Sequence, residues 1–157
     1  SAWAGPWSLA ADAGPMVWLL KQAPVSYAMN LSPAYALTES LGLEAVVGIR
    51  HFSSETEYTE NATTALPLFV GGRYVYQWSD VPVSVFAGLS LGGFVLVEAD
   101  LGREQSRQSL DFDWAGRLCA GTDFHVLDDF SIGLNTALEL TPKNVFFTLG
   151  LGGRVTF

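Results

Sequence analysis

The last fourteen residues of the chain, 144–157, alternate almost throughout between two kinds of side chain. Those in one phase are mostly small or polar, with a single arginine, Arg154. A period of two over this length is typical of a β-strand whose two faces meet different surroundings. We therefore expect a strand with one face against an apolar medium and the other face enclosed. The apolar phase consists of Val145, Phe147, Leu149, Leu151, Val155 and Phe157.

The chain as a whole is apolar, but its apolar residues do not form long runs. Hydrophobic residues make up 49% of the chain and charged residues 15%, against about 25% charged residues in an average soluble protein. No run approaches the roughly 18 apolar residues that a membrane-spanning helix needs. Alternation must therefore distribute the hydrophobicity, which is the pattern of a membrane β-barrel. The length predicts a single domain over residues 1–157.

Turn signals divide the chain into eight alternating segments. Eight is an even number and matches the strand count of the smallest membrane barrels. We therefore expect an all-β fold, an eight-stranded antiparallel up-and-down transmembrane β-barrel. Glycines, serines and nearly all in-strand charges lie opposite the aliphatic face, so we expect lipid outside. The alternative is a soluble lipocalin-like barrel with its apolar face inward, which the extensive aliphatic face and the scarcity of lysines disfavour. The expected strands cover residues 7–20, 26–36, 41–53, 65–77, 81–98, 111–126, 130–141 and 144–157.

The connections between these strands alternate in length. Residues 37–40, 78–80 and 127–129 are tight turns, whereas residues 54–64 and 99–110 are longer polar loops. Membrane barrels keep short turns in the periplasm and longer loops outside. We therefore expect a bacterial outer-membrane protein with periplasmic turns and extracellular loops, and aromatic residues near both interfaces. Those near the turns are Tyr35, Tyr74, Tyr76, Trp78, Phe124, Phe130 and Phe157, and those toward the loops are Tyr27, Phe112, Trp114 and Phe147.

The stretch 66–157 resembles the small bacterial outer-membrane barrels of the outer-membrane protein A and X type. The resemblance rests on Gly72-Arg73-Tyr74, on the run Phe86-Ala87-Gly88-Leu89-Ser90-Leu91-Gly92, on the acidic turn before Phe130 and on the terminal Phe157. It implies a barrel in the Gram-negative cell envelope. We expect this barrel to be a monomer. It implies no particular activity.

Charged residues on the inward phase form a predicted interior network. An unpaired charge inside a narrow barrel is costly, so opposite charges on neighbouring strands should pair. The predicted network consists of Asp12, Glu44, Arg50, Arg73, Arg117, Asp123, Glu139 and Arg154. Its predicted pairs are Glu44 with Arg73, Arg117 with Glu139, and Arg154 with Asp12 across the closing seam.

Eight strands leave an interior that side chains just fill. We therefore interpret the network as a structural plug, and a small pore or hydrophobic-solute channel is the alternative function. Five phenylalanines on the inward phase should add to the plug: Phe52, Phe69, Phe86, Phe94 and Phe146.

Two prolines, Pro15 and Pro33, fall in the middle of the first and second expected strands. A proline deletes a ladder hydrogen bond in a sheet that has no free edge. Two of them close together predict a possible lateral gap through which a lipid chain reaches the interior. Outer-membrane palmitoyltransferases are similar in having wall gaps marked by prolines. The simpler interpretation is a pair of bulges.

One candidate catalytic group lies at the end of the third expected strand. His51 and Ser53 share one face and Glu55 follows them, which is the minimum for an activated hydroxyl nucleophile. The pattern resembles the His-x-Ser motif of outer-membrane lipid A deacylases. It makes a lipid-modifying enzyme, a lipid A acyl hydrolase or acyltransferase, the alternative to a non-enzymatic barrel. An interfacial histidine at a strand end is the simpler interpretation.

The composition limits the classes of partner that we expect the protein to bind. A net charge of −8 argues against nucleic acid, which needs a basic face. The single cysteine, Cys119, has no metal-ligand spacing around it, and we expect neither metal nor cofactor. The expected partners are outer-membrane lipids, lipopolysaccharide and envelope proteins. We therefore expect a non-enzymatic outer-membrane barrel that serves as a structural anchor or interaction surface, alone or as a subunit of an envelope assembly.

Overall fold

The computed structural model describes residues 5–19, 26–52, 64–97 and 110–157, and eight β-strands run through them. Each strand lies within two residues of its expected bounds wherever those bounds fall on described residues, so the eight-strand prediction is confirmed. No helix in the described part of the chain could cross a membrane. The strands are β1 (Trp7–Trp18), β2 (Ser26–Ala36), β3 (Leu41–His51), β4 (Thr64–Gln77), β5 (Val83–Val97), β6 (Leu110–His125), β7 (Phe130–Leu140) and β8 (Val145–Thr156).

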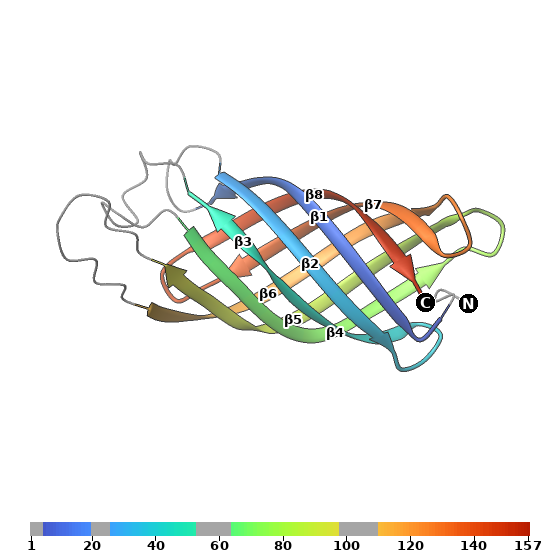
Figure 1. Ribbon diagram of the computed structural model, residues 1–157, viewed down its shortest axis with the longest axis horizontal. Coiled ribbons are helices and arrows are strands. Elements are labelled where there is room, and N and C mark those ends of the chain that lie inside the picture. Colours follow the sequence, from blue (N-terminus) through green and yellow to red (C-terminus); the bar gives the residue numbers. More distant parts are fainter. Residues whose placement is uncertain (1–4, 20–25, 53–63, 98–109) are drawn as a thin grey trace.

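The strands form one closed antiparallel barrel in chain order. Each strand pairs with the next, and β1 pairs with β8 from Ser8 opposite Thr156 to Trp18 opposite Phe146. Figure 1 shows the tilted strands, with the start of β1, the C-terminus and the tight turns at residues 37–40, 78–80 and 127–129 at one end of the barrel. We call this end the turn end, and the opposite end the loop end.

The period-two pattern of the sequence becomes an inner and an outer face. Along β2 every second residue is exposed on the outer wall, while Ser26, Ala28, Asn30, Ser32 and Ala34 between them are buried. The outer wall is aliphatic elsewhere too: Leu91 of β5 is 71% exposed and Leu151 of β8 is 64% exposed. Such apolar exposure is stable only against hydrocarbon, as in a membrane-spanning barrel.

Exposed aromatic side chains gather at both ends of the outer wall, as expected. At the turn end, the rings of Trp7 and Tyr35 lie 4.8 Å apart between centroids. At the loop end, Phe112 and Trp114 lie 5.1 Å apart at nearly right angles. These rings can bury their bodies in lipid and keep their polar edges near water.

The interior contains two apolar clusters. The larger lies toward the loop end and joins Met16, Trp18 and Val46 to four of the five expected phenylalanines. Its rings meet edge to face, with Trp18 and Phe146 5.2 Å apart and Phe69 and Phe94 5.6 Å apart. The smaller cluster contains the fifth phenylalanine, Phe86, with Ala34, Val75, Cys119 and Ala137. The inward orientation of all five phenylalanines is therefore confirmed.

Three prolines interrupt the strand pairing, and they do so in three different seams. The β1–β8 pairing skips Gly14 and Pro15 and resumes at Met16. The β2–β3 pairing skips Ser32 and Pro33, whereas the β1–β2 register is continuous past both prolines. Pro15 and Pro33 face outward but do not widen one common seam. The third interruption, in the β3–β4 seam, lies at Pro67.

Candidate functional site

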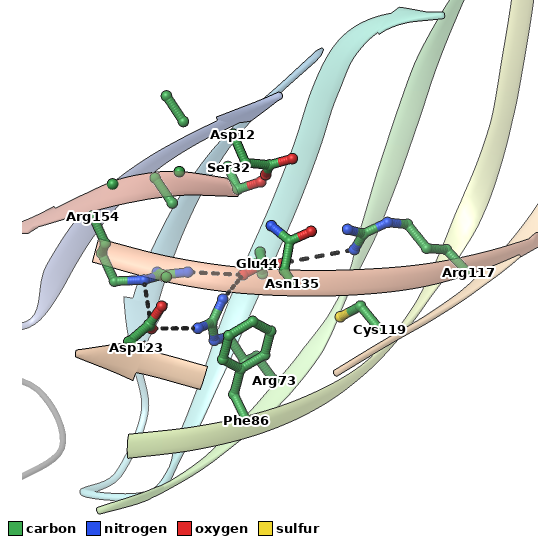
Figure 2. Close-up of a pocket in the computed structure, with 15 residues that line it drawn as sticks. Asp12, Ser32, Glu44, Arg73, Phe86, Arg117, Cys119, Asp123, Asn135 and Arg154 are labelled. Carbon is green, nitrogen blue, oxygen red and sulfur yellow. Dashed lines mark hydrogen bonds and ion pairs between the residues drawn. The ribbon is translucent and has the colours of Figure 1, made fainter. Parts of the chain in front are cut away.

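The charged side chains predicted to point inward lie together inside the barrel. Glu44, Arg50, Arg73, Arg117, Asp123 and Glu139 are buried, and Asp12 and Arg154 are partly buried. They come from six strands, and Phe86 and Cys119 of the smaller apolar cluster lie among them. Figure 2 shows most of this network and the side chains around it.

Arg73 of β4 binds two carboxylates in the part of the network nearer the turn end. Its Nη1 lies 3.0 Å from Oε2 of Glu44 on the neighbouring β3, so the expected pair is present. Its Nη2 lies 3.0 Å from Oδ2 of Asp123, which is on β6, two strands away. The guanidinium also stacks on the ring of Phe86, with Cζ 3.5 Å from the ring centroid, a cation–π contact in a water-poor setting.

The expected pair of Arg154 with Asp12 is wrong. Arg154 lies opposite Ala10 in the β1–β8 register rather than opposite Asp12. Its guanidinium donates to Oγ of Ser8 at 2.9 Å. It also lies 3.4 Å from Oδ2 of Asp123 and 3.7 Å from Oε2 of Glu44. Arg154 thus shares both carboxylates of Arg73, as the dashed lines in Figure 2 show.

Toward the loop end, Arg50 of β3 and Glu139 of β7 form a fully buried pair across the barrel interior. Both nitrogens on one side of the guanidinium contact the carboxylate, and the Nε–Oε2 distance is 3.1 Å. Arg117 lies 3.7 Å from Glu139 and 3.8 Å from Glu44. The expected contact of Arg117 with Glu139 is present, and Arg117 also links the two halves of the network.

Asn30 of β2 connects Asp12 to the network, and the sequence interpretation missed it. Its amide nitrogen donates to Oδ1 of Asp12 at 2.8 Å. Its Oδ1 accepts a hydrogen bond from Nη1 of Arg50 at 2.8 Å. With Asp12 included, four arginines face four carboxylates, so the described network is formally neutral. The available signal was the position of Asn30 on the inward phase of β2.

Glycines leave the space that these side chains occupy. A Cβ on Gly150 would lie 2.6 Å from Oδ1 of Asn135 and 2.8 Å from Oδ1 of Asp12. A Cβ on Gly133 would collide with the carboxylate of Asp123. The cavity that remains beside the network has a volume of about 30 Å³. This is room for about two water molecules.

The described part of the interior also holds a thiol and an imidazole. Cys119 is buried beside Arg117, and His125 lies 3.1 Å from Oγ of Ser84 near the turn end. Among the described residues, no three His, Cys, Asp or Glu side chains are grouped as a metal site would require.

The candidate catalytic group is only partly described. His51 ends β3 on the exposed outer wall, as expected. Ser53 and Glu55 lie outside the described residues, so their positions relative to His51 stay a prediction.

No family model matches this sequence, and no curated protein is significantly similar to it. The fold does match solved structures. Neisserial surface protein A superposes with a TM-score of 0.72 at 16% identity, covering 98% of both chains. The N-terminal β-barrel domain of Pseudomonas aeruginosa OprF gives a TM-score of 0.65 at 13% identity, covering 96% of this chain and 97% of that one.

A third match is Ail, the attachment invasion locus protein of Yersinia pestis, solved in complex with the heparin analogue sucrose octasulfate. It gives a TM-score of 0.62 at 14% identity over 96% of each chain. The architecture and these matches agree: the chain has the fold of the small eight-stranded outer-membrane β-barrels.

The buried pair of Arg50 and Glu139 gives a testable prediction. Glu139→Leu leaves Arg50 without its carboxylate, so we expect a loss of about 3–5 kcal/mol in the free energy of unfolding. Replacing both partners, with Arg50→Met and Glu139→Leu, should cost much less, because no charge is left unpaired. Urea unfolding in detergent micelles measures both.

Asp128→Asn, in an exposed turn, is the control and should change stability by no more than about 0.5 kcal/mol. If Glu139→Leu unfolds at the same urea concentration as the unmodified protein, the pair does not stabilise the barrel as described.

Proposed function

We propose that this protein is a non-enzymatic anchor in the bacterial outer membrane that presents its loops as an interaction surface. The observation that carries the proposal is the filled interior. Two apolar clusters and a neutral charge network occupy the space that a channel would need, and the cavity beside the network measures about 30 Å³. The parts of the molecule left to interact are the wall and the two ends.

The proposed orientation places the turn end in the periplasm and the loop end outside the cell. It rests on the general rule that membrane barrels keep their short connections in the periplasm. The segment 53–63 carries Glu55, Glu57 and Glu60 and no lysine or arginine. An acidic segment of this composition can bind basic protein partners, or lipopolysaccharide phosphates through divalent cations.

A filled barrel should not conduct ions. We expect no discrete conductance steps when the purified protein is inserted into planar lipid bilayers, whereas a general porin in the same apparatus should give steps. Insertion is checked independently by protease protection in vesicles of the same lipid. Reproducible steps that scale with the amount of inserted protein would favour the pore alternative over the anchor.

The interaction role is tested with a photo-crosslinking residue at Tyr58, in the acidic segment. In cells of the native host, this position should give a defined adduct with an envelope component. The same probe at Leu127, in a tight turn, should not give that adduct. Replacing Glu55, Glu57 and Glu60 by glutamine should reduce the Tyr58 adduct several-fold if charge directs the contact. The same adducts from both positions, or none from Tyr58, would contradict the proposed surface.

A further inference from the structure

The outer wall has a hollow of about 430 Å³ over β2, β3 and β4, near the loop end. The hollow is on the outer side of the wall and the charge network is on the inner side, and Asn30 borders both. Asn30, Gly48 and Pro67 lie along its floor. Its rims are the outward-facing side chains of Met29, Leu31, Val47, Ile49, Leu66 and Leu68.

The sequence explains why the wall is hollow at this place. Pro67 has no N–H to donate, and the β3–β4 pairing skips Gly48 and Ile49 before it resumes at Arg50 opposite Ala65. Pro67 is fully buried toward the interior. Gly48 contributes no side chain to the wall. Asn30, Gly48 and Pro67 therefore place no side chain on the outer wall, and the neighbouring aliphatic side chains stand around them as rims.

The floor has little to offer a polar ligand. The Asn30 amide nitrogen is hydrogen-bonded to Asp12, and its oxygen to Arg50. The rims are entirely aliphatic or thioether side chains. A hydrocarbon chain therefore fits the hollow better than a sugar or a column of water.

A row of polar side chains lies directly beyond the hollow toward the loop end. His51 pairs with Tyr27 on one side and with Thr64 on the other. The next outward row along the strands contains Met29, Ile49 and Leu66, which are rims of the hollow. Tyr27 is 66% exposed, His51 is exposed and Thr64 is half-buried. All three side chains can donate hydrogen bonds, and a phosphate group offers only acceptors at neutral pH.

We propose that β2, β3 and β4 form a binding site for one membrane lipid, with an acyl chain in the hollow and the headgroup phosphate on Tyr27, His51 and Thr64. The inference goes beyond the anchor role and does not depend on the loops. A lipid is the proposed ligand because the hollow opens onto the apolar outer wall between the two aromatic bands, where acyl chains surround the protein. The polar row lies where a headgroup would lie.

The test uses the whole protein, purified in detergent and incubated with palmitoyl-oleoyl phosphatidylglycerol, with bound lipid counted by native mass spectrometry. The unmodified protein should keep one lipid at a detergent concentration that strips the others. Val47→Trp fills the hollow and should reduce retention at least several-fold. Val70→Trp places the same side chain on the outer wall of β4 away from the hollow, and should retain lipid like the unmodified protein.

A second arm isolates the headgroup. Palmitoyl-oleoyl glycerol has the same chains and no phosphate, and the unmodified protein should retain it several-fold less than phosphatidylglycerol. His51→Ala should lower retention of phosphatidylglycerol toward that level and leave retention of the phosphate-free lipid unchanged. Equal retention of both lipids by the unmodified protein would overturn the headgroup contact.

Equal retention of phosphatidylglycerol by Val47→Trp, Val70→Trp and the unmodified protein would overturn the acyl-chain site. The shift of the folded band on unheated gels checks that each variant has folded. If Val47→Trp does not fold, Leu31→Trp fills the same hollow from β2 and decides the question by the same comparison.

Discussion

An arginine or a carboxylate is stable inside this barrel only because groups of opposite charge surround it. Taking either ion out of water costs several kcal/mol, and the network offsets that cost through short contacts such as Arg73 with Glu44 and Asp123. This requirement for paired charges constrains the whole fold. Each strand must turn its charges to one face, so the opposite face is left aliphatic and must find hydrocarbon. A one-residue slip in register would exchange the two faces, and the charges would then meet the acyl chains.

The same network restricts what the barrel can do. Arg50 and Glu139 meet across the interior from β3 and β7, and Arg117 connects them to Glu44. Phenylalanine rings close the interior toward the loop end. With the interior occupied by groups that stabilise one another, specificity has to come from the exterior. The loop sequences and the hollow at Pro67 are two such places, and they would serve different partners.

Much of this architecture could be predicted from the sequence, because a period of two directly reports which side chains share a face. The strand bounds, the inward phenylalanines and the pair of Glu44 with Arg73 follow from that period and from adjacency along the chain. Contacts across the interior do not follow from it. Two of the pairs across the interior, Arg50–Glu139 and Arg154–Asp123, join strands that are not neighbours. Arg154 does not pair with Asp12 because the β1–β8 register places Arg154 opposite Ala10. Asn30 was missed because it is uncharged, and the hollow at Pro67 depends on which residue of β3 lies opposite it.

The central claim is that the aliphatic face touches acyl chains while the charges are enclosed. Nitroxide labels at Leu134 and Leu149, in a Cys119→Ala background and in lipid vesicles, test it most directly, with a label at Asp128 as the aqueous reference. Power-saturation measurements should show that molecular oxygen reaches Leu134 and Leu149 readily while a water-soluble nickel chelate does not, and Asp128 should show the reverse. Free access of the nickel chelate to Leu134 and Leu149 would contradict the account.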